Sequence, residues 1–218
     1  RLEHEAARTK THPRLHLLAA PCASRLPFTA GSESYQHAPP FRHLKGMTEF
    51  STAALEATAA LRELFPETPL QRNDFLSARH DAEIWLKRED LSPVRSYKLR
   101  GAFNAMRKVR AARPDQHQFV CASAGNHAQG VAFACRHFGV QGVIFMPVTT
   151  PQQKIDKTRV FGGDNIRIEL TGDYFDQTLA AAQAYCADRQ AHFLSPFDDP
   201  DVIEGQASVA VELLEQLG

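Results

Sequence analysis

The sequence predicts an α/β fold in which parallel strands are flanked by helices. From residue 119 onward, short apolar runs typical of buried strands alternate with longer stretches in which apolar residues recur at helical spacing. This strand–helix unit repeats about every 24 residues, which is typical of right-handed crossovers over a parallel sheet. With 43% hydrophobic residues, the 218-residue chain also has enough apolar material to form a core.

Strand-like and helix-like segments follow one another along most of the chain. A helix is expected over 48–65 because Pro66 ends its apolar pattern, and Thr68-Pro69-Leu70 is typical of a turn into a strand. Further strands are expected at residues 83–87, 119–122, 142–146, 166–170 and 192–194. Further helices are expected from about 97, after 122, at 151–161, after 170 and from 201. Gly162-Gly163 has the composition of a helix C-cap and turn.

Apolar residues at helical spacing mark the faces that these helices are expected to bury. The helix over 48–65 carries Phe50, Ala54, Ala57, Leu61 and Leu64 on one face. The helix from about Tyr97 carries Leu99, Phe103, Met106 and Val109, and the helix after residue 170 carries Phe175, Leu179, Ala182 and Cys186. The last helix carries Ile203, Ala207, Ala210, Leu214 and Leu217. We expect the strands that cover this last face to lie beyond Gly218.

Residues 1–46 differ from the rest of the chain in composition. They hold five of the ten histidines, five of the thirteen prolines, and seven Lys or Arg against three Asp or Glu. No sustained helical or strand period is present, so we expect a disordered extension or sequence translated upstream of Met47. An Arg-rich, acid-poor segment also suits an organellar transit peptide, which is the alternative.

Charge and cysteine usage narrow the classes of function. From Met47 onward, 18 Lys or Arg face 22 Asp or Glu, and a mildly acidic body without a basic stripe argues against nucleic-acid binding. No apolar run approaches the ~18 residues of a membrane span. The cysteines lack the spacing of metal ligands, so we expect no metal site. We expect their thiols to be free and packed, and the protein to reside in a reducing compartment, the cytoplasm. These cysteines are Cys22, Cys121, Cys135 and Cys186.

Lys98 falls in the first turn of the helix from about Tyr97, with Ser96 as a candidate N-cap. The helix dipole disfavours an ammonium group there by a few tenths to about 1 kcal/mol, and Arg95 and Arg100 are close in sequence. Such a position suits a neutral, nucleophilic amine. The alternative is a lysine that points to solvent from an ordinary helix.

A second candidate site is the loop from Ser123 to Gly130, which joins the strand at 119–122 to the next helix. Open parallel sheets bind their ligands at the carboxyl ends of strands, and the first turn of a helix offers free N–H groups to an anion. An amino-acid carboxylate suits this place, and Asn126 adds a neutral donor. The alternative is a tight turn in which Asn126 caps the helix.

Three segments resemble motifs of the fold-type II pyridoxal-phosphate enzymes. The stretch from Lys87 to Ala102, K-x-E-D-x-x-x-x-x-S-[FY]-K-x-R-G-A, resembles the family's lysine segment. It is most similar to threonine dehydratase (threonine ammonia-lyase) and its serine dehydratase and serine racemase relatives. The loop from Ser123 resembles the family's S-x-G-N-H-x-Q-G motif. The stretch from Pro196 to Gln206 resembles P-F-D-D-x-x-V-I-x-G-Q, which favours threonine and serine dehydratases over the cysteine synthase branch.

The resemblance implies a role for each matched residue. Lys98 is the residue that would bond covalently to pyridoxal 5'-phosphate and act as the base, with Tyr97 beside it where the family usually has Phe. Asn126 would hydrogen-bond the 3-hydroxyl of the cofactor. Four loop residues would line the pocket for the substrate carboxylate, namely Ser123, Ala124, Gly125 and His127.

The implied function is deamination of L-threonine, and also of L-serine, to a 2-oxo acid and ammonia. This reaction belongs to isoleucine biosynthesis or to threonine degradation. There are two alternatives. One is a serine racemase, which shares the first two motifs. The other is a protein fragment without catalytic activity. The resemblance also implies that the protein binds a small amino acid as its substrate and that the complete protein forms a homo-oligomer.

The implied architecture is a two-domain α/β fold like that of tryptophan synthase β. Residues 91–190 would form the small domain, and residues 47–90 and 191–218 would contribute to a large domain. The Gly-rich loop that binds the cofactor phosphate in this family does not occur up to Gly218. We therefore expect the chain to be the N-terminal part of a longer enzyme and inactive by itself.

Overall fold

The structure is a computed structural model that describes residues 15–17 and 48–218. Contacts within the chain divide these residues into two units, one of residues 15–17 with Pro69–Arg88 and one of residues 48–68 with Glu89–Gly218. The extension expected over 1–46 lies outside the described residues except for Leu15–Leu17, and so does Cys22.

The first unit is a three-stranded sheet with one short helix. Its strand order is β1 (Leu15–Leu17), β3 (Glu83–Lys87) and β2 (Leu70–Arg72), with β1 parallel and β2 antiparallel to β3. The strand expected at 83–87 and the strand after Thr68-Pro69 are thus confirmed. The helix α2 (Asp74–His80) was not expected, and the side chain of Asn73 caps it by accepting from the backbone N–H of Leu76 at 2.8 Å.

The second unit contains the predicted parallel sheet. The strand order is β6 (Ile166–Leu170), β5 (Gln141–Met146), β4 (Gln118–Ala122) and β7 (His192–Phe193), and each neighbouring pair is parallel. The helices α4 (Asn126–Phe138), α5 (Gln152–Gly162) and α6 (Phe175–Arg189) connect the strands. As expected, Gly163 ends α5 with a positive φ of 55°, and a 3-10 turn (Gly163–Asn165) follows.

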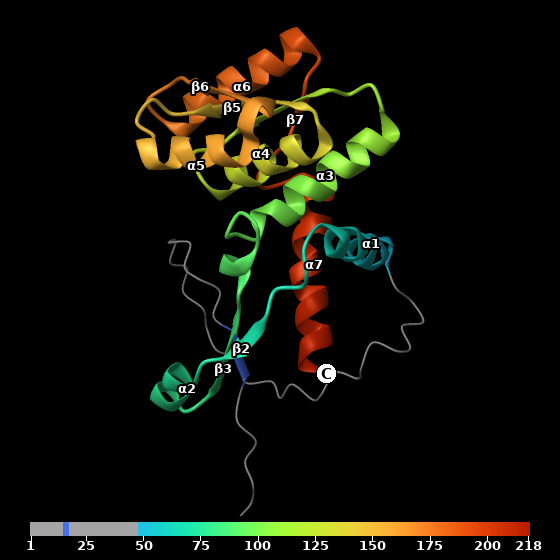
Figure 1. Ribbon diagram of the computed structural model, residues 1–218, viewed down its shortest axis with the longest axis vertical. Helices are drawn as coiled ribbons and strands as arrows, with labels where there is room; N and C mark the ends of the chain where they lie inside the picture. The colour runs from blue at the N-terminus through green and yellow to red at the C-terminus, as the bar shows by residue number, and fades with distance from the viewer. Residues whose placement is uncertain (1–14, 18–47) are drawn as a thin grey trace, which may run out of the picture. The chain divides into compact units, whose positions relative to one another are not determined.

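Alternate strand residues pack on opposite faces of this sheet. Cys121 and Ile144 join the main core with residues of α4 and with Met106, whereas Val120 and Val143 join a second core that includes Ala182 of α6. Figure 1 shows α6 on one side of the sheet and α4 and α5 on the other. Both faces of β4 and β5 are therefore covered, which explains why these strands read as continuous apolar runs.

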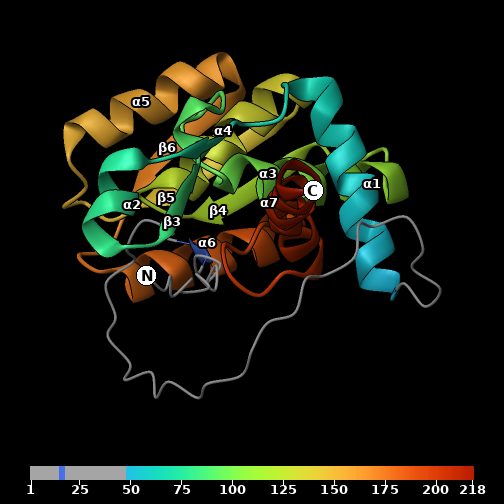
Figure 2. The same cartoon turned by 90° about the horizontal axis from the view of Figure 1, so that it is seen from below.

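Three helices of the second unit pack beside the sheet: α1 (Glu49–Leu64), α3 (Lys98–Ala112) and α7 (Pro200–Leu217). Helix α3 contacts both α4 and α7, and α7 also contacts α1. Figure 2 shows α7 nearly end-on with α1 beside it. The expected face of α3 is buried throughout, whereas the buried part of the α1 face begins at Ala54 and leaves Phe50 in the first turn exposed. Phe175, expected to face inward at the start of α6, is also exposed.

Helix α7 packs through a different face from the apolar one that its sequence suggests. Its buried residues are Val202, Gly205, Ser208 and Glu212, whereas Ile203, Ala210, Leu214 and Leu217 of the expected stripe are exposed. Glycine permits this packing, because a Cβ added at Gly205 would lie 2.4 Å from the backbone oxygen of Arg100. Apart from Val202, small and polar residues thus form the contact between α7 and α3.

The cysteines among the described residues are free thiols, as expected, of which Cys121 and Cys135 are buried and Cys186 is half-buried. Burial raises the pKa of Cys135 to about 12 and that of Cys186 to about 11, and the pKa of Cys121 is also raised by burial. Within residues 48–218 and the strand β1, no helix is both long enough and apolar enough to cross a membrane. The same residues contain no cluster of three His, Cys, Asp or Glu side chains suited to a metal ion.

Candidate functional site around Lys98

Lys98 is the first residue of α3 and so lies in its first turn, as the sequence predicts. Its half-buried side chain reaches the turn between β7 and α7, where Nζ donates a hydrogen bond to the carbonyl oxygen of Pro196 at 3.0 Å. The same nitrogen lies 5.4 Å from the ring centroid of Tyr97 and 5.8 Å from that of Phe197. The lysine therefore does not simply point to solvent, because a carbonyl and two aromatic rings surround its amine.

The turn before Lys98 is fixed by two serine hydroxyls. Ser92 Oγ donates to the carbonyl oxygen of Ser96 at 3.1 Å and accepts from its backbone N–H at 2.9 Å. Ser96 Oγ in turn accepts from the backbone N–H of Lys98 at 3.2 Å. Helix α3 begins one residue later than expected, with Tyr97 in the N-cap position, but the Ser96 hydroxyl still satisfies one N–H of the first turn.

The predicted loop follows β4 directly and leads into α4. Gly125 is in the N-cap position without a side-chain cap, and Asn126 is the first helical residue. The alternative in which Asn126 caps the helix is therefore wrong. Ser123 Oγ accepts from the backbone N–H of Gly125 at 3.2 Å, and a Cβ added at Gly125 would meet nothing within 4 Å. The α4 N-terminus thus has no side-chain cap and open space beside Gly125, which suits an anion.

His127 is buried and links this loop to the end of β7. Its Nε2 donates to the carbonyl oxygen of Leu194 at 3.1 Å, since a carbonyl can only accept, and its buried Nδ1 has no hydrogen-bond partner. Burial lowers the pKa of His127 to about 4; the bond to Leu194 opposes the shift and the charge of Lys98 adds to it. The ring is therefore neutral at neutral pH, and only the backbone N–H of His127 can attract an anion.

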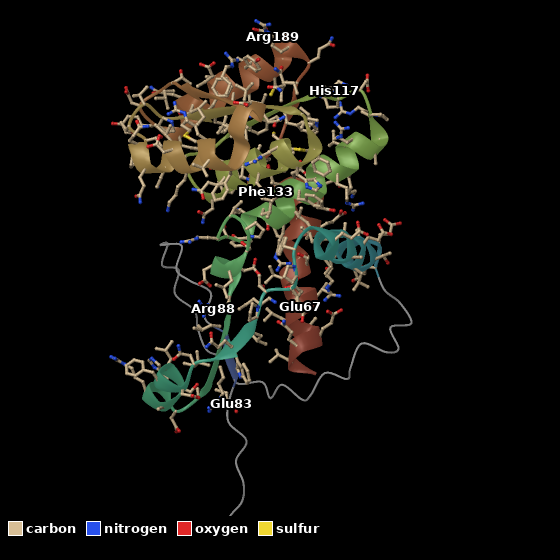
Figure 3. The ribbon with its side chains drawn as sticks, in the orientation of Figure 1. Glu67, Glu83, Arg88, His117, Phe133 and Arg189 are labelled. Carbon is tan, nitrogen blue, oxygen red and sulfur yellow. The ribbon has the colours of Figure 1, made fainter. Side chains whose placement is uncertain are left out.

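The two predicted motifs meet in the structure. His127 contacts Leu194 and Lys98 contacts Pro196, so both motifs reach the same chain segment after β7. A Cβ added at Gly130 would lie 3.0 Å from the backbone oxygen of Lys98, so the first turn of α3 packs directly against the second turn of α4. Phe133 of α4, labelled in Figure 3, continues this contact by packing against the cluster that contains Leu99. Asn126 is exposed at the start of α4, and Ser123 and Ala124 are half-buried.

A buried charge cluster beside Lys98 escaped the analysis of the sequence. Arg100, with an exposed fraction of 0%, donates to both carboxylate oxygens of Glu89 at 2.8 and 2.9 Å and to both of Glu212 at 2.8 Å. Its Nη1 also donates to Ser208 Oγ at 3.0 Å and its Nη2 to Thr68 Oγ1 at 3.2 Å. Burial lowers the pKa of Arg100, but the bonds to Glu212 and Glu89 outweigh it, so the pKa is raised.

This cluster corrects one expectation. Arg100 was expected to act on Lys98 as a neighbouring positive charge, but two carboxylates compensate its charge within the protein interior. Nearer the surface, Arg62 of α1 pairs with Glu67, labelled in Figure 3, and with Glu215 of α7. Glu89 and Arg100 belong to the K-x-E-D…K-x-R-G-A motif, so the sequence does single out these two residues of the cluster. The third charged residue, Glu212, lies 112 residues away from Arg100, and no local pattern connects them.

Comparisons with known proteins show which family most of the chain resembles. A family model described as "Pyridoxal-phosphate dependent enzyme" matches residues 61–218. The chain is 50% identical over 163 residues to the L-threonine dehydratase biosynthetic IlvA of Bacillus subtilis, covering 75% of this chain and 38% of that protein. It is thus similar to little more than a third of that relative's length.

Solved structures give the same fold. Threonine deaminase isoform 2 of Solanum lycopersicum, in its processed form, superposes with a TM-score of 0.69 at 37% identity, over 78% of this chain and 49% of that one. A serine racemase of maize superposes with a TM-score of 0.69 at 26% identity, over 76% of this chain and 49% of that one. The predicted α/β fold of the fold-type II enzymes is confirmed by these superpositions.

Proposed function

The chain belongs to the family of pyridoxal-phosphate dependent enzymes, and on that premise we propose that the complete protein is a threonine dehydratase. It would convert L-threonine, and L-serine as a second substrate, to a 2-oxo acid and ammonia. The observation that carries the proposal is that Lys98, in the first turn of α3, packs against the second turn of α4, whose N-terminus has no side-chain cap. The 50% identity to a threonine dehydratase designated biosynthetic supports a place in isoleucine synthesis.

The residues around Lys98 fit pyridoxal phosphate. A lysine amine is the group that bonds to the aldehyde of this cofactor, and open space lies beside Gly125. Lys98 would hold the cofactor through Nζ, with Tyr97 beside it and Asn126 as donor to its 3-hydroxyl. When bound, the cofactor supplies a conjugated ring that takes up electrons as a proton leaves Cα of the substrate.

The chain's own residues would bind the substrate and move the proton. The backbone N–H groups of the loop from Ser123 through Ala124 and Gly125 to His127 would hold the carboxylate, because the His127 ring is neutral. Lys98 would accept the Cα proton at Nζ when the substrate amine has taken its place. Departure of the β-hydroxyl then distinguishes a dehydratase from a racemase.

Serine racemase is the second candidate because the maize serine racemase superposes as well as the tomato enzyme does. Sequence identity favours the dehydratase, at 50% against 26%. For the complete protein we further propose a homo-oligomer in the cytoplasm, with 91–190 as the small domain and 47–90 and 191–218 in the large domain. The strands β4, β5 and β6 with their helical crossovers support the small domain, and β7, which pairs with β4, continues the same sheet just past residue 190.

Product analysis tests the proposal. The complete reading frame is expressed, loaded with pyridoxal phosphate, and given L-threonine or L-serine. We expect 2-oxobutanoate from threonine and less pyruvate from serine, with no D-serine. Formation of D-serine as the main product would show the racemase instead, and failure of the loaded protein to change either amino acid would contradict both candidates.

A further inference from the structure

Side-chain hydrogen bonds stabilise the partly exposed turn between β7 and α7. Asp199 caps α7 by accepting from the backbone N–H groups of Asp201 at 2.9 Å and Val202 at 3.2 Å. Ser195 Oγ donates to Asp198 at 2.6 Å and accepts from the backbone N–H of Phe197 at 3.4 Å. Side chains on both sides of Phe197 thus fix the backbone that carries the Pro196 carbonyl.

This turn presents two groups to Lys98. The carbonyl oxygen of Pro196 accepts from Nζ at 3.0 Å, and the Phe197 ring lies within cation–π range of the same nitrogen. The Phe197 side chain is 70% exposed, so it is no core residue. Its ring meets Phe175 edge-on at a centroid distance of 6.2 Å, which fixes its direction.

We infer that residues 195–199 form a holding site for the amine of Lys98 when it is not bonded to the cofactor, with Phe197 as a positioning residue. The inference rests on the proposed function, in which the Lys98 nitrogen is released from the cofactor and bonded to it again in each turnover. A flexible four-carbon side chain would otherwise sample many rotamers during the interval. A carbonyl and an aromatic face at one place limit that sampling and keep the nitrogen close to the reacting atoms.

The first test uses the complete protein without cofactor. Lysine amines are methylated with formaldehyde and cyanoborohydride, and the rate at Lys98 is followed by peptide mass spectrometry. Loss of the Phe197 ring removes a contact that favours the protonated amine, so Phe197→Leu should speed labelling of Lys98 about two- to fivefold. Phe197→Tyr keeps the aromatic face and should label like the wild type.

Phe75→Leu is the matched control, because Phe75 is 71% exposed and belongs to the other unit of the chain. It should leave the labelling rate of Lys98 unchanged. Equal rates in Phe197→Leu and wild type would overturn the inference, as would an equal increase in Phe75→Leu or no rescue by Phe197→Tyr.

A second measurement separates this inference from the proposed function. With L-threonine, Phe197→Leu should lower kcat while KM stays within about twofold, since the ring holds the released amine and not the substrate. If Lys98 labelling responds as expected but no 2-oxobutanoate forms in the wild type, the proposed function fails and the holding site stands. If 2-oxobutanoate forms normally but labelling does not respond, the holding site fails alone.

Discussion

Replacing Arg100 by alanine should destabilise the protein far more than an ordinary loss of an ion pair. The substitution removes the guanidinium that both carboxylates share and leaves Glu89 and Glu212 facing each other, with side-chain exposures of 14% and 2%. It also removes the stacking of the guanidinium on the Phe65 ring at 5.3 Å. Two buried acids that have lost their shared cation must then ionise against burial or take up protons.

The size of the effect follows from burial. Removing one member of a buried ion pair costs about 3–5 kcal/mol, a large share of a typical total of ~5–15 kcal/mol. Arg62→Ala is the matched control, since Arg62 also pairs with two glutamates but its side chain is 39% exposed. Exposed pairs contribute only about 0.2–1 kcal/mol, so the control should remain close to the wild type.

Urea unfolding of the complete protein, followed by circular dichroism, measures both variants. A triple replacement of Arg100 with methionine and of Glu89 and Glu212 with leucine should recover much of the lost free energy, because no charge is then left buried. If Arg100→Ala cost no more than Arg62→Ala, the cluster would not hold α3 and α7 together, and the reasoning would be refuted.

Three further predictions concern the site. Lys98→Ala should abolish the cofactor label that borohydride fixes on the protein; label retained on another residue such as Lys87 would contradict the assignment. Gly205→Ala should destabilise by several kcal/mol, as a new Cβ would lie 2.4 Å from the Arg100 oxygen, and an unchanged urea midpoint would exclude this close packing. His127 takes up its proton more readily unfolded, near pH 6.5, than folded, near pH 4; stability should therefore fall by roughly 3 kcal/mol as pH drops through that window, and a urea titration of His127→Asn should lack this component.

The sequence predicts the sheet and α3 well because their burial follows a simple period. The strands at 119–122 and 142–146 are covered on both faces, so each reads as an uninterrupted apolar run. The helix with Leu99 and Met106 on one face buries both residues fully. Local apolar spacing is enough for such elements.

Helix α7 shows where apolar spacing fails. Its sequence suggests a face of Ile203, Leu214 and Leu217, yet these residues are exposed and Ser208 and Glu212 are buried. A glutamate becomes a packing residue only where an arginine such as Arg100 meets it, and periodicity carries no information about a partner so far away in the chain. The contact of Lys98 with Pro196 cannot be predicted from apolar spacing for the same reason, since it depends on how two distant segments of the chain meet.

The crossing of α3 and α7 also has a mechanical consequence. At Gly205 the two backbones approach so closely that no side chain separates them, and Arg100 fastens the same region to α7 two residues after Lys98. Helix α7 therefore cannot slide along its axis past α3 without breaking these contacts, so the backbone of the first turn of α3, which includes Lys98, is held in register with α7.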